Sequence, residues 1–225
     1  MGKSFQDTLN YIKTSLPNQF IEISDAEILQ RLKQHTLPEF SIYAPKYERV
    51  ILNYENCIDD GFGIFEIPYN GDADEIIEIA DYYSAKAPPS FSNDPISIAD
   101  AILSATSKPL EPIPELDLNN PKRVIFDMPC SKVSVFLPMV LILKTIHKTP
   151  KTIPTEYYHR WWKPYALADI KLMIAESRAK FQQLSTPIGQ IALNTEELKQ
   201  EALQTKEQII QELKRNWNLR TVYFV

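Results

Sequence analysis

The sequence predicts an α+β fold: a helical bundle built from the N- and C-terminal helices, an inserted mostly antiparallel β module, and a C-terminal strand. Near both ends of the chain, apolar side chains recur at steps of three and four, the spacing of an amphipathic helix. Between the ends, residues 48–69 and 122–146 alternate and are rich in Val, Ile, Phe and Tyr, which favours strands. The expected segments are the N-terminal helices (1–47), the β module (48–150) and the C-terminal helical hairpin with its strand (151–225).

Two helices are predicted in the N-terminal segment. The first covers residues 4–15, is amphipathic and has Ser4 as its candidate N-cap. The second begins at a capping box, in which Ser24 and Glu27 satisfy each other's free backbone donors. Because a proline restricts the residue before it, this helix should end before Pro38. His35 then lies at the helix end, where a cationic ring suits the helix dipole, and we assign it that role rather than a catalytic one.

The β module begins with a predicted hairpin over residues 48–69, whose turn is Asp-Asp-Gly at 59–61. Residues 75–85 fit a strand or a helix equally well. A proline-rich arm over 86–121 follows, and residues 122–146 return to strand character.

The two cysteines, Cys57 and Cys130, are far apart in the sequence, and neither has a CxxC partner or a nearby histidine. The spacing therefore predicts two buried thiols.

The C-terminal segment is organised around a helix over residues 155–184, buried on two sides, with Pro164 at its start or at a kink. Trp161 and Trp162 could form a stacking platform, but without surrounding arginines core packing is favoured. Asp169 is placed on a narrow polar strip of this helix. A polar helix over 194–216 keeps one apolar stripe, which indicates packing against the previous helix or a neighbouring subunit.

The sequence contains little that points to catalysis. No phosphate-binding loop, dinucleotide fingerprint or zinc-protease motif is present, and His35, His147 and His159 lie in three separate segments. The pair His159 and Glu156 could share one helix face, but such pairs are common on surfaces. The acidic residues of the module do not follow the order of a calcium loop, so solvated turns are favoured over a cation site: Asp59, Asp60, Asp72, Asp74 and Glu75. We expect no metal and no cofactor.

Charge and hydropathy restrict the partners. The 225 residues carry a net charge of -5, so specific nucleic-acid binding, which needs clustered Lys and Arg, is not expected. No run of eighteen apolar residues occurs, so we expect no membrane span. Five glycines against 17 prolines indicate stiff, extended connections.

Four stretches of the chain resemble a known group of proteins. The opening FQDTLNYIKTSLP and the following IEISDAEILQRLKQHTLPEFSIYAP are similar to structural proteins from the neck and tail apparatus of tailed bacteriophages. WWKPYALADIKLMIAESRAKF and STPIGQIALNTEELKQEALQTKEQIIQEL resemble the same group. The resemblance implies a non-enzymatic virion protein, made in the host cytoplasm and present as a ring of copies in the neck, the head-to-tail connector between portal and tail. Its implied partners are copies of itself, the portal and other neck and tail proteins, with DNA passing nearby.

Three alternatives stay open beside the neck. A tail baseplate component belongs to the same apparatus, and an assembly adaptor or chaperone would act without staying in the particle. The third alternative is an enzyme, a metal-dependent nuclease that uses Asp59, Asp60 and Glu66. In the sequence, no basic residues that could bind phosphate are clustered with these three acids.

The last residues of the sequence form a candidate partner-binding site. Val222, Tyr223, Phe224 and Val225 favour a strand, and a strand with few charges can add to a sheet edge. Its backbone would give affinity, and its alternate side chains, Val222 with Phe224 and Tyr223 with Val225, would fill pockets on either face.

Overall fold

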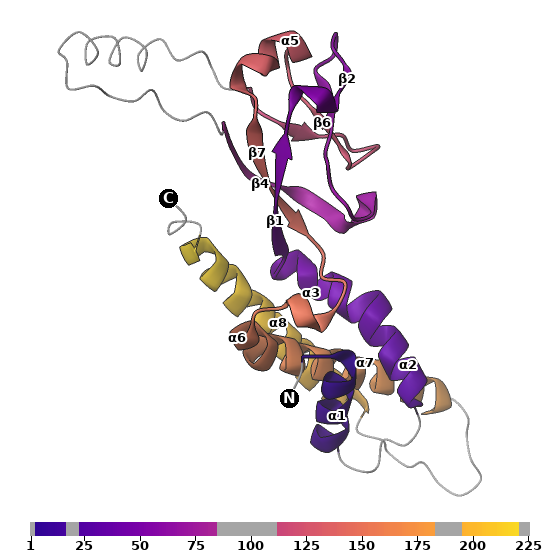
Figure 1. Cartoon of the computed structure of the whole chain (residues 1–225). Helices are drawn as coiled ribbons and strands as arrows, with labels where there is room; N and C mark the ends of the chain where they lie inside the picture. Colours follow the sequence, from indigo (N-terminus) through magenta and orange to yellow (C-terminus); the bar gives the residue numbers. More distant parts are fainter. Residues whose placement is uncertain (1–2, 17–22, 85–111, 183–194, 221–225) are drawn as a thin grey trace, which may run out of the picture. The chain divides into compact units, whose positions relative to one another are not determined.

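The computed structural model describes residues 3–16, 23–84, 112–182 and 195–220 (Figure 1). The chain divides into two compact units. The helical unit comprises residues 1–46 and 146–225, and the β unit comprises residues 47–145. Both helices and antiparallel sheets are therefore present, as an α+β fold requires. In the described residues, no helix is long and apolar enough to cross a membrane.

Within the described part of the chain, the helical unit contains the five longer α-helices and two π-helical turns. Its elements are α1 (Phe5–Ser15), α2 (Asp25–Arg31), a π-turn (Leu32–Thr36), α3 (Leu37–Tyr43), α6 (Thr155–Tyr157), a second π-turn (Tyr158–Trp162), α7 (Lys163–Gln182) and α8 (Thr195–Arg220). One core joins side chains from both ends of the chain, including Leu9 and Leu32 from the N-terminal helices, Trp162 and Ile170 from the π-turn and α7, and Leu213 from α8. Helix α8 packs along α7, as expected if its apolar stripe packs against the previous helix.

The helix starts follow the sequence. Ser4 caps α1 by accepting a hydrogen bond from the backbone of Asp7. Ser24 and Glu27 form the predicted capping box at the start of α2. Both predictions are confirmed because each depends only on residues within one helical turn.

The predicted end before Pro38 is wrong, because the helix continues to Tyr43. A π-turn lies directly before Leu37-Pro38, and a second one lies directly before Lys163-Pro164. In the first, the backbone N–H of Leu37 donates to the carbonyl of Leu32, and in the second, that of Lys163 donates to the carbonyl of Tyr158. The wider turn accommodates the missing donor and the ring of the proline that follows. His35 therefore lies inside a continuous helix, where it is exposed, and the dipole argument for it fails.

The β unit has two sheets. One has the strand order β1-β7-β4 and the other β2-β3-β6-β5. Side chains from both sheets contribute to one core, including Leu52, Phe65, Val124 and Leu141. The strands are β1 (Lys46–Leu52), β2 (Cys57–Asp59), β3 (Ile64–Glu66), β4 (Ile76–Ser84), β5 (Glu115–Leu116), β6 (Arg123–Ile125) and β7 (Met139–Thr145), and α5 (Cys130–Val133) precedes β7.

The predicted hairpin over 48–69 is confirmed only in its second half. Strands β2 and β3 pair antiparallel around the Asp-Asp-Gly turn, whereas β1 joins the other sheet. The undecided segment 75–85 contains a strand, β4, paired antiparallel with β7. Within 122–146, residues 130–136 are helical rather than extended, so the strand prediction fails there. Most of the predicted proline-rich arm, residues 86–111, lies outside the described residues.

Candidate functional site

The turn between β2 and β3 presents an aromatic side chain to solvent. The Oδ1 atom of Asp59 accepts hydrogen bonds from the backbone of Gly61 at 3.0 Å and of Phe62 at 3.4 Å. Gly63 has a φ of +62°, and a Cβ there would lie 2.0 Å from the carbonyl oxygen of Met128, so only glycine fits. The Phe62 side chain is 73% exposed on this fixed turn.

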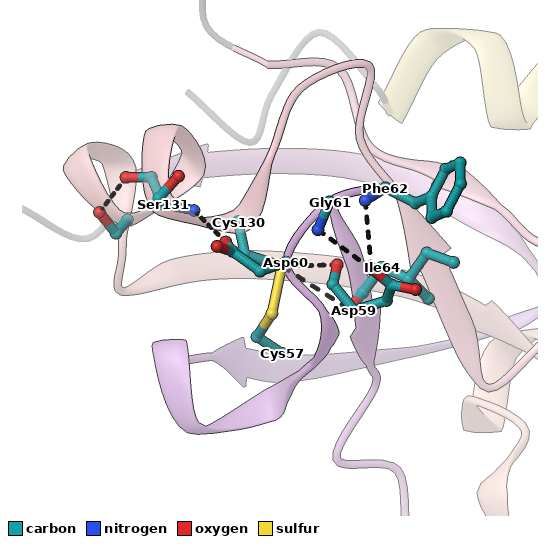
Figure 2. The surroundings of a disulfide bond; sticks show 9 residues. Cys57, Asp59, Asp60, Gly61, Phe62, Ile64, Cys130 and Ser131 are labelled. Carbon is teal, nitrogen blue, oxygen red and sulfur yellow. Dashed lines mark hydrogen bonds between the residues drawn. A yellow bond between two sulfur atoms is a disulfide. The ribbon is translucent and has the colours of Figure 1, made fainter.

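The same turn is fastened to α5 by a disulfide and two hydrogen bonds (Figure 2). Cys57 and Cys130 form the disulfide, which corrects the prediction of two free thiols. The backbone of Cys130 donates to the Asp60 carbonyl at 3.0 Å, and that of Ser131 donates to Asp60 Oδ1 at 2.8 Å. The cysteines meet because β2 pairs with β3, and Cys130 Sγ lies 3.8 Å from the carbonyl oxygen of Ile64 on β3. A sequence separation of 73 residues does not reveal this proximity.

One row of residues on the outward face of the β2-β3-β6-β5 sheet has two isoleucines at its centre. Asp59 pairs with Ile64, Ile64 with Ile125, and Ile125 with Glu115 across the strands. The neighbouring register row, which contains Phe65 and Val124, is buried in the core, and successive residues of a strand point to opposite faces. The row from Asp59 to Glu115 therefore faces outward, with acidic residues at its two ends.

Figure 2 shows the side chains of Phe62 and Ile64 on the side of the turn away from the disulfide. We name the set Asp59, Phe62, Ile64, Glu115 and Ile125 the β patch. Ile125 is 36% exposed, Ile64 is partly exposed, and both acidic residues are exposed. The sequence could have indicated this patch only if the strand register had been known.

The acidic residues considered as a cation site do not come together. Asp59 accepts backbone hydrogen bonds within the turn, and Asp60 accepts one from the backbone of Ser131 in α5. Glu75 is buried and accepts a hydrogen bond from the hydroxyl of Tyr69 at 2.9 Å, whereas Asp72 and Asp74 are exposed. The prediction of solvated turns therefore fails for Glu75, which is buried, whereas Asp72 and Asp74 are solvated.

Among the described residues, the group with metal-binding geometry is Cys57, Asp60 and Cys130. The two sulfur atoms are bonded to each other, so they are not available as thiolate ligands. The third residue of the nuclease alternative, Glu66, lies opposite Arg123 on the next strand, a basic neighbour that the sequence did not indicate.

In the helical unit, Asp169 is the centre of a buried ion cluster rather than part of a polar strip. Its side chain is 1% exposed. It accepts hydrogen bonds from Arg31 at 3.0 and 3.3 Å, Thr36 at 2.8 Å and Lys206 at 3.0 Å. Lys206 also pairs with Glu39 at 2.8 Å. These contacts join α2, α3, α7 and α8, so the cluster ties the N-terminal helices to the C-terminal ones.

The partners of Asp169 determine its ionisation. Burial alone raises the pKa of this carboxyl, but the hydrogen bond from Arg31, the charge of Lys206 and the hydrogen bond from Thr36 outweigh it, so the pKa is lowered. The same carboxylate is the main cause of a raised pKa for Arg31. Asp169 and Arg31 are therefore both charged at neutral pH.

The aromatic and histidine candidates have structural roles. Trp161 and Trp162 are buried, as the core-packing interpretation predicted. His147 is 3% exposed; its Nε2 donates to the Ala44 carbonyl at 3.0 Å, and its backbone donates to Ser41 at 3.0 Å. Burial lowers the pKa of His147 to about 4, so this ring is neutral at physiological pH. His159 is exposed.

The predicted partner-binding residues Val222, Tyr223, Phe224 and Val225 lie outside the described residues. Their role is taken up below as a proposal.

The two units differ strongly in charge. The helical unit contains 17 Lys and Arg against 13 Asp and Glu, a net charge of +4, whereas the β unit contains 7 against 16, a net charge of -9. Together they give the overall charge of -5. The net charge of the whole chain is therefore the sum of a positive helical unit and a strongly negative β unit.

Exposed basic side chains lie on and beside the C-terminal half of α8 in the helical unit. Arg160, whose side chain is 65% exposed, lies 3.4 Å from Glu212, and Lys214 lies 5.6 Å from the centre of the Tyr43 ring. Lys214 and Arg215 are exposed, and Ile42, next to Tyr43, is 60% exposed. We name the set Ile42, Arg160, Lys214 and Arg215 the basic end.

Comparison with known proteins identifies the family. No curated protein and no solved structure matches the chain. A family model described as "Bacteriophage ring protein" matches residues 4–222. This match covers both units, including the middle of the chain, where the sequence showed no resemblance to phage proteins. The chain therefore belongs to the bacteriophage ring protein family.

Proposed function

We propose that this protein is a structural virion component that forms a ring of copies in the neck of a tailed phage, between the portal and the tail. The observation that carries the proposal is the match to the ring protein family over residues 4–222. The net charge of -5 is suited to a conduit, because a ring through which DNA passes should not hold the duplex.

The organisation of the chain fits a ring component. In our proposal the helices of segments 1–47 and 151–225 form a bundle, and segment 48–150 is inserted as a β module. The cluster around Asp169 supports this proposal, since it joins helices from both ends of the chain. In this proposal the cluster holds the helices of the bundle together, and the bundle and the β module each contact neighbouring proteins.

Native mass spectrometry of the purified protein tests ring formation. We expect one discrete species of several copies in addition to any monomer, and a protein that is monomeric at all concentrations would refute the ring. Cryo-electron microscopy of virions carrying a fusion tag on this protein tests the location. Density for the tag at the neck supports the proposal, and density at the tail tip would assign the protein to the baseplate instead.

The proposed function includes no catalysis and no cofactor. The alternative nuclease would need a metal, so the test is cleavage of duplex DNA with added Mg²⁺ by wild type and by Asp59→Ala. We expect no cleavage by either protein. Mg²⁺-dependent cleavage that is lost in Asp59→Ala would establish the enzyme.

Val222 to Val225 are proposed to add as a strand to a sheet edge of an adjacent protein in the neck, the portal or a tail component included. Two double variants separate the faces of this strand: Val222→Lys with Phe224→Lys, and Tyr223→Lys with Val225→Lys. Each should reduce joining of heads to tails in complemented infections, because each removes the side chains that fill one set of pockets. Normal joining with both variants and with residues 220–225 deleted would show that the strand is dispensable.

A further inference from the structure

We propose that neighbouring copies in the ring meet through unlike surfaces: the β patch of one copy contacts the basic end of the next. This inference rests on the proposed ring and deepens it by naming the two faces of the contact. The β patch is Asp59, Phe62, Ile64, Glu115 and Ile125, and the basic end is Ile42, Arg160, Lys214 and Arg215.

Ring symmetry requires two different surfaces. A two-fold contact uses the same surface on both copies and stops at a dimer, whereas a closed ring of more than two copies needs a head-to-tail contact between unlike surfaces. The chain must therefore carry two patches that fit each other and do not fit themselves.

Charge makes these two patches unlike. The β unit has a net charge of -9 and the helical unit of +4, so two β units would repel each other and a β unit would attract a helical unit. The charges near the two patches also differ. Asp59 and Glu115 end the exposed row of the β patch, and the next outward row pairs Glu66 with Arg123, whose charges are opposite. At the basic end Arg160 pairs with Glu212, and Lys214 and Arg215 are two further exposed cations on α8. Self-association of either patch is disfavoured by like charges.

The apolar parts of the patches supply the contact area. Phe62 is 73% exposed and Ile42 60% exposed, and exposed aromatic residues on rigid supports are frequent anchors of interfaces. The turn that carries Phe62 is held by Asp59, Gly63 and the Cys57–Cys130 disulfide. Little conformational freedom would therefore be lost when Phe62 is buried against a neighbour.

Two variants of the full chain test the proposal. The first, Phe62→Ser with Ile125→Ser, removes the apolar part of the β patch. The second, Lys214→Glu with Arg215→Glu, reverses the charge of the basic end. Matched controls are Ile51→Ser, an exposed apolar residue on the other sheet, and Lys199→Glu, an exposed lysine elsewhere on α8. Circular dichroism and tryptophan fluorescence establish that each variant is folded.

Native mass spectrometry reads out the assembly. We expect the wild type and both controls to form rings, and each double variant alone to lose the ring species and remain monomeric. When the two double variants are mixed, each still has one intact patch, so a one-to-one heterodimer should form and grow no further. Raising the salt concentration should dissociate this heterodimer, because its charges become screened.

The outcomes separate this inference from the proposed function. If wild type forms rings and either double variant also does, or if the mixture stays monomeric, the named contact is wrong and the ring stands. If folded wild type forms no ring under any condition, the proposed function and this contact are both refuted.

Discussion

Replacing Asp169 should weaken the helical unit more than replacing any exposed acid. In Asp169→Ala the buried partners of the carboxylate lose an acceptor, and removing one member of a buried ion cluster costs about 3–5 kcal/mol. The lower value applies here, because Lys206 keeps Glu39 as a partner and the Arg31 side chain, 30% exposed, can reach water. We therefore expect a loss of about 3 kcal/mol, or about 6–12 °C in melting temperature for a chain of this length.

Urea unfolding followed by tryptophan fluorescence measures this loss of stability in the helical unit. All three tryptophans belong to the helical unit, so the signal does not report on the β unit. Glu207→Ala is the matched control: it removes an exposed acid from α8 and should change stability by less than about 0.5 kcal/mol. If Asp169→Ala came within about 1 kcal/mol of wild type, the cluster would not hold these helices together and the reasoning would be refuted.

The pH dependence gives a second measure of the same carboxylate. The pKa of Asp169 is lowered in the folded protein, so its contribution is fully present above the unfolded pKa of about 3.9 and is lost as the pH falls through the folded pKa. The stability difference between wild type and Asp169→Asn should therefore be constant near neutral pH and shrink below about pH 4. A difference that persists unchanged in acid would mean that packing, and not charge, is responsible.

Three further predictions concern other parts of the fold. Folding lowers the pKa of His147 from 6.5 to about 4, so between these pH values the unfolded chain binds a proton at this ring and the folded chain does not. The free energy of unfolding of wild type should therefore fall by up to about 3 kcal/mol from pH 6.5 to pH 4, and that of His147→Gln should not. Equal pH dependence of the two proteins in urea titrations would contradict this. Ser24→Ala removes the capping hydroxyl that accepts from Glu27 and should cost about 1 kcal/mol in the same titration, and no change would show that the cap is not needed. Alkylation of the unreduced protein should modify neither Cys57 nor Cys130. Because the disulfide closes a loop of 73 residues, Cys57→Ser should destabilise the β unit by about 4 kcal/mol. Hydrogen exchange measures this loss, and the unfolding transition followed by tryptophan fluorescence should not change.

The sequence by itself determined the features that depend on neighbours along the chain. The caps at Ser4 and Ser24 lie within one turn of the donors they satisfy, and the Asp-Asp-Gly turn between β2 and β3 needs only a few residues. The apolar spacing of α7 and α8 was also sufficient, because a long helix repeats its spacing of three and four residues many times. The phage resemblance, quoted from both ends of the chain, agrees with the family match over residues 4–222.

Only the tertiary structure decided the features that join distant parts of the chain. The partner of Cys57, the burial of Asp169 and the outward row from Asp59 to Glu115 each depend on which segments lie side by side. An aspartate within a helix looks the same in the sequence whether it faces water or the side chain of Arg31. The burial of a charge and the pairing of two sulfurs are set by three-dimensional proximity, and proximity between residues that are 73 or 138 positions apart leaves no local pattern in a single sequence.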